Sequence, residues 1–410
     1  MVLSQQEGNG LIYNFKISSV GPGWSSGSDL VHYPSGMDLA MKLHYLKVVY
    51  LFNSEAAQGL TIMRIKEAMF KWLHHYYIAC GRFRRSDSGR PFMKYNDCGA
   101  RLFEAKCEKT IDEWIEMKDW SLHWTRIIIL SFSLNAASEF INSWGTVMAG
   151  LPLKFEKLNP MPQKPINPST IEKELLSAKR VDPVGDHWIT ANNCKMDTFS
   201  FCITTTQLSN IQRKIWGPNF DQASIFESLC AIIWQCIAKV REGSETKIVT
   251  LCKNDLSKSG HGTLGNYQII SNVVAQFPIV DTDLKQLAAL LVDRAVNERN
   301  EIEEAVERDN GVTDFFVYGA NLTFVDLEEV DLYELTLKGH KPKFVYYTIE
   351  GVGNEGAVLV LPWIQGGRKD GGGQGRLVTI IFPENQMLEL KSELKEKGVL
   401  LEVESDVEEE

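Results

Sequence analysis

The sequence predicts a mixed α/β fold made of two halves of similar size. Its 410 residues are 44% hydrophobic and 23% charged, which is typical of globular chains long enough for two or three domains. Both halves contain amphipathic helices and short apolar strands. Between the halves, residues 150–185 hold six prolines, too many for regular structure, so this segment is predicted to cross the surface. The predicted units are residues 1–150, a crossover at 151–190, residues 191–400 and an acidic tail at 401–410.

The first half begins with a predicted strand at residues 13–20. Residues 38–52, rich in β-branched and aromatic side chains, are predicted to form a helix and then a strand. Residues 61–80 carry apolar side chains at spacings of three and four, which predicts an amphipathic helix. Turn residues at 87–91 separate two further short strands.

The second half is predicted to alternate strands and helices. Residues 223–240 have a broad apolar face, which is typical of a helix packed on a core. Residues 283–308 are predicted to form one long helix whose charged second half is solvated on most faces. The remaining predicted elements are strands at 199–205, 247–252, 344–348, 357–361 and 377–382 and a closing helix at 384–397.

The net charge of -10 is unevenly distributed. The last nine residues, 402–410, carry six acidic residues and no basic one, so the rest of the chain is only mildly acidic. This balance argues against a nucleic-acid binder, or an anionic-membrane binder, that relies on bulk charge. The tail itself is predicted to be disordered.

The apolar runs are short. Residues 127–132 and 357–364 are the best candidates, and both are well below the roughly 18 to 20 residues that a membrane helix needs. The start of the chain has no basic patch followed by an apolar stretch, so a secretory signal is not expected. The sequence therefore predicts a protein that is soluble or peripheral to a membrane.

The cysteines do not form a metal-binding pattern. None of the eight belongs to a CxxC pair, and several lie in apolar segments. They are predicted to be reduced, packed thiols facing the cytosol, and no metal site is expected.

Three motif matches lack the structural context that their chemistry requires. Residues 23–27 fit the GxSxG nucleophile pattern, but Pro34 follows and no helical period begins there. Residues 260–265 fit GxGxxG, yet a polar loop separates them from the preceding strand and no amphipathic helix opens after them. Six glycines within residues 366–375 are interpreted as a flexible hairpin loop between two strands. The sequon at Asn321 would matter only in a secreted protein.

Several longer segments resemble a known family. Residues 75–82 (HYYIACGR), 89–91 (GRP) and 96–99 (NDCG) look like the N-terminal signature of the plant BAHD acyltransferases, and 226–234, 264–266 and 378–387 resemble later parts of that family. Other segments are closer to one clade, the eceriferum-two and glossy-two type wax proteins: 37–45 (MDLAMKLHY), 185–188 (GDHW) and 314–350. The resemblance covers nearly the whole chain and implies a two-domain mixed-sheet fold of the coenzyme-A-dependent acyltransferase type.

The resemblance also implies a test for catalysis. BAHD enzymes transfer an acyl group from coenzyme A to an alcohol or amine, and the His of an HxxxD motif takes the proton from the acceptor. No histidine of this chain is followed by Asp at the fourth position. The pairs are His32 with Gly36, His44 with Val48, His74 with Ile78, His75 with Ala79, His123 with Ile127, His187 with Ala191, His261 with Gly265 and His340 with Phe344.

The loss is interpreted as an excision. After His123 the family continues through core strands to HxxxD, whereas this chain passes through Ile127–Ile129 directly to residues 137–145, which resemble the helix after the motif. We therefore expect the first half to lack some core strands, truncated near residues 124–136 by a splice variant or faulty gene model. The second family motif, DFGWG, falls at residues 336–342, where only Lys341-Pro342 matches, as is expected of the wax clade.

No other histidine is a strong replacement for the base. His187 follows Asp186 and is the weak candidate, although a structural or surface role is favoured because it lies at the end of the crossover without an identifiable nucleophile. His74 and His75 are predicted to lie in the core or on the helix surface, and His340 on a solvated loop. Lys338, Lys341 and Lys343 could meet an acidic partner or a coenzyme A phosphate, although such a charge run is usually solvated.

The leading functional hypothesis is an accessory of very-long-chain fatty-acid elongation for cuticular wax, without HxxxD catalysis. The wax-clade resemblance implies action beside a condensing enzyme, peripherally on the cytoplasmic face of the endoplasmic reticulum, with the cytosol as the alternative location. A coenzyme A thioester is a possible ligand, and no tightly bound cofactor is expected. The alternatives are an acyl-CoA-dependent transferase acting on an alcohol or amine, and a non-functional product.

Overall fold

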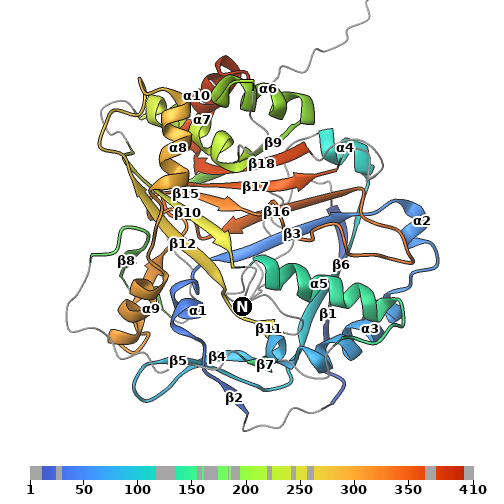
Figure 1. Cartoon of the computed structure of the whole chain (residues 1–410). Coiled ribbons are helices and arrows are strands. Elements are labelled where there is room, and N and C mark those ends of the chain that lie inside the picture. Colours follow the sequence, from blue (N-terminus) through green and yellow to red (C-terminus); the bar gives the residue numbers. More distant parts are fainter. Residues whose placement is uncertain are drawn as a thin grey trace, which may run out of the picture.

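A seven-stranded mixed sheet is the largest element of the computed structural model (Figure 1). The structure describes residues 12–24, 30–116, 134–154, 159–160, 174–182, 184–185, 194–218, 224–241, 246–255, 263–364 and 375–400. The central strands β10, β15 and β17 run parallel, and β12, β13, β18 and β9 join antiparallel on the two sides. In sheet order, the strands are β13 (Val296–Asn297), β12 (Gln268–Val274), β10 (Ile248–Asn254), β15 (Leu322–Asp326), β17 (Ala357–Trp363), β18 (Gly375–Pro383) and β9 (Met196–Ile203).

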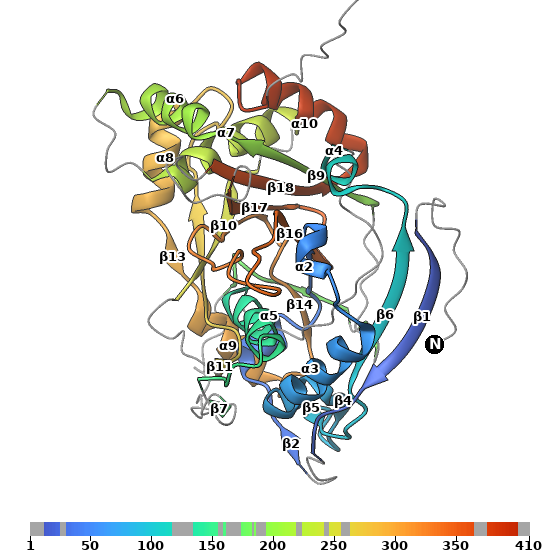
Figure 2. The same ribbon diagram turned by 90° about the vertical axis from the view of Figure 1, so that its right-hand side faces the viewer.

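Four helices cover one face of this sheet (Figures 1 and 2). They are α6 (Thr205–Trp216), α7 (Ile225–Val240), α8 (Leu284–Asp293) and α10 (Glu384–Glu396). Helix α7 is buried from Phe226 to Ala238, because it packs against the sheet and against its neighbouring helices. The sequence also encodes the helix starts: Thr204 and Gln207 form a reciprocal capping box at α6.

The opposite face of the sheet carries the N-terminal half of the chain. Strand β3 (Tyr45–Leu51) pairs antiparallel with β16 (Phe344–Glu350), so a strand from the first half is held by one from the second. Helices α1 (Gly36–Ala40), α3 (Ile62–His75), α5 (Leu134–Met148) and α9 (Arg299–Arg308) surround the hydrophobic core on this side. Trp72 of α3 lies against Phe140 of α5, with ring centroids 4.1 Å apart. Smaller helices are α2 (Ser54–Ala57), α4 (Ile111–Glu116) and the 3-10 turn η1 (Tyr77–Cys80).

The other strands form small separate sheets. The longest of these is a two-stranded ribbon of β1 (Ile12–Val20) and β6 (Ala100–Cys107), which curves along the side of the molecule (Figure 2). The remaining small sheets are β2–β5–β4 (Val31–His32, Pro91–Lys94, Arg82–Arg85), β14–β8 (Asp314–Phe316, Lys179–Val181) and β11–β7 (Thr263–Leu264, Asn159–Pro160).

The mixed α/β prediction is confirmed, as are the predicted strands at 13–20, 344–348, 357–361 and 377–382. The single long helix predicted at 283–308 is wrong. Helix α8 ends at Asp293, and Val296 and Asn297 pair with β12 before α9 begins. The spacing of apolar residues along the chain cannot reveal this pairing with residues 271–272, because it depends on a long-range contact.

Two other boundaries differ from the prediction. The helix predicted over 61–80 is α-helical only to His75, and Cys80 closes a 3-10 turn. The Pro-rich segment contains the short strands β7 and β8 among its described residues, so it is not wholly irregular. Within the described ranges, no helix combines the length and apolarity that a membrane crossing requires.

Candidate functional site

Five of the eight histidines lie in the described part of the chain. The weak candidate base, His187, falls outside it, as do His123 and His261. The acidic tail and the predicted excision point also lie largely outside the described residues. The histidines that can be placed are His32, His44, His74, His75 and His340.

His44 is buried between the two halves of the chain and serves as an acceptor. Its Nε2 accepts hydrogen bonds from the backbone N–H groups of Val317 at 3.0 Å and Tyr318 at 3.2 Å. Burial lowers the pKa of His44 to about 3, so the ring is neutral at physiological pH. A general base needs a free nitrogen lone pair, and the lone pair on Nε2 is already engaged. His44 is therefore an anchor for the backbone after β14.

The other placed histidines occupy less buried positions. His74 lies 5.6 Å from the Trp24 ring, and His75 adjoins it on α3. His340 is exposed, in the tight turn that it closes with Leu337. Burial lowers the pKa of His32, with the nearby Asp38 carboxylate opposing that shift.

Polar side chains from four distant segments meet where the two halves join. We call Asp38, Asn266, Gln268, Arg299 and Tyr318 the seam cluster. The Asp38 carboxylate accepts from the backbone N–H of Asn266 at 2.8 Å. Arg299 donates to the carbonyls of Gln268 at 2.7 Å and Asn266 at 2.8 Å, and the Tyr318 hydroxyl donates to Gln268 Oε1 at 2.7 Å. The cluster thus joins α1, the loop before β12, α9 and the turn after β14.

Asp38 has two tasks in this cluster. Its Oδ2 accepts from the backbone N–H of Ser35 at 3.0 Å and from the Ser35 hydroxyl at 2.7 Å, which completes the capping box of α1. Burial raises the pKa of Asp38, and the hydrogen bonds from Ser35 and Asn266 oppose that rise. The carboxylate is thus a structural acceptor with all its bonds directed to protein groups.

One member of the seam cluster and its neighbour in the sequence each have a buried polar group without a hydrogen-bond partner among the described residues. These groups are the Asn266 side-chain amide Nδ2 and the Tyr267 hydroxyl. Asn266 is 1% exposed and Tyr267 is 6% exposed. Most buried polar groups in proteins are paired, so unpaired donors at this junction could donate to a carbonyl or phosphate oxygen of a ligand.

A fully buried ion pair lies close by. Lys42 Nζ is 2.8 Å from the Asp314 carboxylate, and neither side chain is exposed. The same ammonium donates to the carbonyls of Gly311 at 3.1 Å and Thr313 at 2.9 Å. The Asp314 carboxylate also accepts from the backbone N–H of Val184 at 2.9 Å. All three Lys42 donors are engaged, which is what a buried ammonium requires.

A second group of charges lies where strands β10, β15 and β17 end. Lys253 pairs with Glu227 at the start of α7, and Arg376 pairs with Glu328. Burial raises the pKa of Asp326, on β15, to about 6, and the Glu328 and Glu227 carboxylates add to the rise. The carboxyl ends of parallel strands commonly border ligand crevices. Among the residues with described positions, no group of three or more His, Cys, Asp or Glu could hold a metal ion.

The lysines that the sequence singled out do not converge on one site. Lys338 contacts the carbonyl of Gln58, Lys341 pairs with Glu334 at 2.9 Å, and Lys343 pairs with Asp112. All eight cysteines are free, and Cys80, Cys230, Cys236 and Cys252 are buried, as the prediction of packed thiols requires.

Sequence reasoning missed the seam cluster as a site, although segments 37–45, 264–266 and 314–350 had been singled out. Asp38, Asn266 and Tyr318 lie in these segments, but only the structure shows that they are buried together. The sequence indicated the charged residues at the ends of β10, β15 and β17 only weakly. Lys253 and Asp326 each lie at the end of a short apolar strand.

The arrangement matches solved structures over almost its whole length. Vinorine synthase superposes with a TM-score of 0.64 at 15% identity, covering 94% of this chain and 98% of that one. TRI101 of F. sporotrichioides, solved with coenzyme A and T-2, gives a TM-score of 0.62 at 12% identity, covering 90% and 99%. The fold is that of the coenzyme-A-dependent acyltransferases.

Sequence comparisons agree with this fold. The family model described as "Transferase family" matches residues 34–123. ECERIFERUM 26-like of Arabidopsis thaliana is 35% identical over 98% of this chain and 99% of its own length. ECERIFERUM 26 and ECERIFERUM 2 of the same plant are 34% and 31% identical, over 97% and 93% of this chain and 98% of each relative. The chain belongs to the BAHD-type transferase family, in the group of ECERIFERUM proteins.

The alignment with ECERIFERUM 26-like also bears on the length of the chain. It extends over 436 positions, whereas this chain has 410 residues. At least 26 positions of that relative, 436 less 410, therefore have no counterpart here.

Proposed function

We propose that this protein is an accessory of very-long-chain fatty-acid elongation in cuticular wax formation, acting with a condensing enzyme and without HxxxD catalysis. The observation that carries the proposal is the absence of an HxxxD sequence from a chain of the ECERIFERUM group. The engagement of His44 with two backbone donors supports it, because this buried histidine has no lone pair to offer on Nε2. The proposed role depends on the shape of the protein and on its contacts with the condensing enzyme, and we assign no residue a catalytic role.

A coenzyme A thioester is the ligand that we propose for this fold. Three TRI101 structures, one from F. sporotrichioides and two from F. graminearum, are named with coenzyme A and a second compound and support it by analogy of fold. The unpaired donors of Asn266 and Tyr267 are groups from which the carbonyl and phosphate oxygens of such a ligand accept hydrogen bonds. No tightly bound cofactor is proposed, and the location proposed is the cytoplasmic face of the endoplasmic reticulum.

Expression in yeast with a condensing enzyme tests the role. The expected result is a longer distribution of fatty acyl chains than the condensing enzyme produces alone. The ECERIFERUM 26-like protein serves as the full-length comparison, and the empty vector as the baseline. An unchanged acyl profile, with both proteins present at equal abundance, would contradict the proposal.

The competing proposal is an acyl-CoA-dependent transferase acting on an alcohol or amine. Membership of a transferase family favours it. The purified chain would then form ester or amide from acyl-CoA and a supplied acceptor, and His187→Ala would remove that activity while His340→Ala, an exposed control, would not. Absence of both product and chain-length change would leave the non-functional product as the explanation.

The proposed excision is tested on genomic DNA. We propose that the positions missing relative to ECERIFERUM 26-like lie between the codons for His123 and Ala137, within the first of the two proposed domains. A skipped exon at that place would support a splice variant or faulty gene model. Uninterrupted coding sequence across that place would contradict it.

A further inference from the structure

The exposed aromatic side chains all belong to the N-terminal part of the chain. Sixteen large hydrophobic residues are exposed in the described structure, and every aromatic one among them lies between residues 13 and 103. Trp24 is 71% exposed, and Phe70 is 47% exposed. The six are Tyr13, Phe15, Trp24, Tyr33, Phe70 and Phe103.

Helix α3 carries the most exposed part of this surface. Met63, 74% exposed, and Phe70 are seven residues apart, so they share one stripe of the helix. His74 continues the stripe, and the Trp24 ring lies 5.6 Å from it. Gly23, next to Trp24, approaches the Phe70 ring, since a Cβ placed on it would lie 3.2 Å from that ring. Met63 and Phe70 share this side of the helix with Glu67, which pairs with Lys71 at 2.7 Å, and the Trp24 ring lies at its C-terminal end beside His74.

The β1–β6 ribbon continues the surface. Ile17 stands directly opposite Phe103, and Phe15, which is 44% exposed, precedes them at a bulge of β1. Val20 and Leu102 point the other way, toward the core. We call Met63, Phe70, Trp24, Phe15, Ile17 and Phe103 the aromatic face.

The charge of this region is opposite to that of the rest of the chain. Residues 12–107 contain 13 of the 43 Lys and Arg residues but only 7 of the 53 Asp and Glu residues. Residues 12–107 therefore carry a net charge of +6, 13 less 7, although the whole chain carries -10. The six acidic residues of the tail are too few to account for this difference, so other parts of the chain are acidic as well. Arg64 is exposed one position from Met63, and Arg101, opposite Ser19, lies on the same side of the ribbon as Phe103.

We propose that the aromatic face docks this protein on the surface of an anionic lipid bilayer. Tyr, Trp and Phe side chains favour the boundary between lipid headgroups and acyl chains, where an apolar ring meets a polar surface. Basic side chains beside them are attracted to anionic headgroups. A protein partner would need a fitted surface, whereas a bilayer accepts scattered aromatic and basic side chains. The inference goes beyond the proposed function, because binding to lipid does not require the condensing enzyme.

Flotation of the purified full-length chain with vesicles tests the proposal. One set of vesicles is pure phosphatidylcholine, and the other contains 30% phosphatidylserine in phosphatidylcholine, a composition chosen to give a strong anionic surface. The chain is expected to float with the anionic vesicles, and with the neutral ones at least tenfold less. Raising the salt to about 0.5 M should weaken the binding, since salt screens the attraction between charges.

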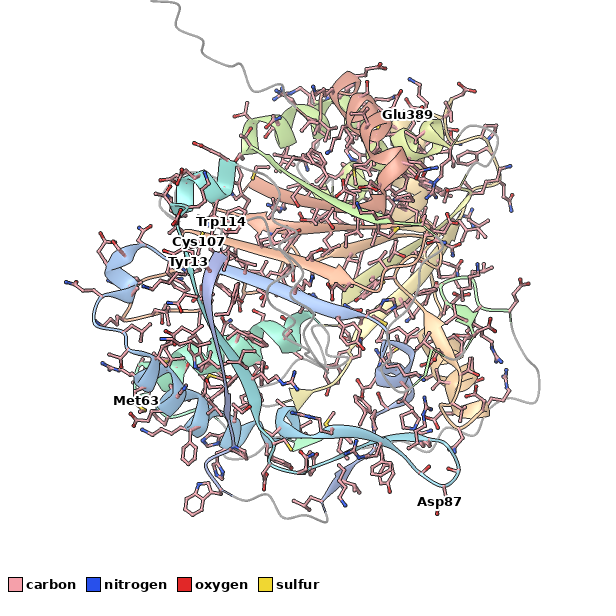
Figure 3. The ribbon with its side chains drawn as sticks, turned by 180° about the vertical axis from the view of Figure 1, so that it is seen from behind. Tyr13, Met63, Asp87, Cys107, Trp114 and Glu389 are labelled. Atoms are coloured by element: carbon pink, nitrogen blue, oxygen red, sulfur yellow. The ribbon has the colours of Figure 1, made fainter. Side chains whose placement is uncertain are left out.

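Two matched pairs of variants locate the contact. The double variant Trp24→Ala/Phe70→Ala should lower the bound fraction at least tenfold, whereas Leu388→Ala should leave it unchanged. Leu388 is an 82% exposed apolar residue on α10, and Figure 3 shows its neighbour Glu389 and Met63 at opposite ends of the molecule. Arg64→Glu/Arg101→Glu should lower binding about tenfold, whereas Lys214→Glu/Lys285→Glu, on α6 and α8, should not.

Each result of these experiments either supports the proposal or contradicts it. Failure of the unmodified chain to float, or equal flotation by all variants, overturns it. If Trp24→Ala/Phe70→Ala melts below the assay temperature, Met63→Asp replaces it, because that side chain is exposed. Loss of chain elongation in yeast by these variants, without vesicle binding by the unmodified chain, would assign the face to a protein partner instead. Vesicle binding without elongation would retain the docking face and reject only the proposed function.

Discussion

The carboxylate of Asp38 accepts a hydrogen bond from the backbone N–H of Asn266 at 2.8 Å, although 228 positions separate the two residues. The same side chain begins helix α1 by capping it together with Ser35. One buried acid therefore sets a local helix start and holds the loop before β12. Since the seam cluster is built around this contact, loss of Asp38 should affect both halves of the chain.

Asp38→Ala is expected to lower the free energy of unfolding by about 2–4 kcal/mol, because it removes a cap and leaves the buried Asn266 N–H unpaired. Urea unfolding followed by circular dichroism measures the change. Asp283→Ala is the control. Asp283 caps α8 by accepting from Lys285 at 2.9 Å, so its loss should cost only about 1 kcal/mol. Equal costs for the two substitutions would contradict a linking role for Asp38.

Features that depend on local sequence could be predicted, whereas features that depend on contacts between distant segments could not. Strands at 344–348, 357–361 and 377–382 were predictable, because a continuous apolar run indicates burial on both faces. The break between α8 and α9 was not, because it depends on pairing with β12. The role of His44 was equally hidden. Its partners are backbone N–H groups 273 and 274 positions away, which leave no trace in side-chain spacing.

His44 should make stability sensitive to acid. Its pKa is lowered to about 3 in the folded state, below the ordinary value of 6.5. The unfolded chain therefore binds the proton more readily, so stability present above pH 6.5 is lost as the pH falls toward 3. Between pH 7.5 and pH 5, His44 should account for about 2 kcal/mol of that loss.

The substitution His44→Gln tests this, because an amide oxygen can accept the two backbone N–H groups without titrating. Urea unfolding at pH 7.5 and pH 5 should show a smaller acid loss for this variant than for the unmodified chain. His340→Gln, at an exposed position, should leave the loss as it is. An acid loss equal in all three proteins would refute the assignment.

The buried pair of Lys42 and Asp314 should be more costly to break than to replace. Lys42→Met leaves the Asp314 carboxylate buried without its cation, and a cost of about 3–5 kcal/mol is expected. In Lys42→Met/Asp314→Asn, the amide keeps an oxygen for the Val184 N–H and carries no charge. The double variant should recover part of the lost free energy of unfolding. If it is as unstable as the single variant, the unpaired charge is not the cause.

Asp326 should behave in the opposite way to His44. Its pKa of about 6 in the folded state lies above the ordinary 3.8, so its contribution to stability is present below pH 3.8 and lost as the pH rises through 6. Asp326→Asn keeps an oxygen for the Glu328 N–H and should raise the free energy of unfolding by about 1–3 kcal/mol at pH 7.5, and much less at pH 4. Asp281→Asn, at an exposed position, serves as the control. A gain of the same size at both pH values would exclude ionisation as its origin.

The proposed excision makes a prediction about the stability of the whole fold. Among the described residues, β3 pairs only with β16 and β1 only with β6, so each of these strands has an edge without a partner strand. Unpaired edges promote association between chains, and a smaller core lowers stability. Inserting the corresponding block of ECERIFERUM 26-like between His123 and Ala137 should therefore raise the melting temperature and reduce aggregation. Thermal melts of the two proteins, with light scattering recorded in parallel, make the comparison, and equal midpoints would show that the chain is complete without the block.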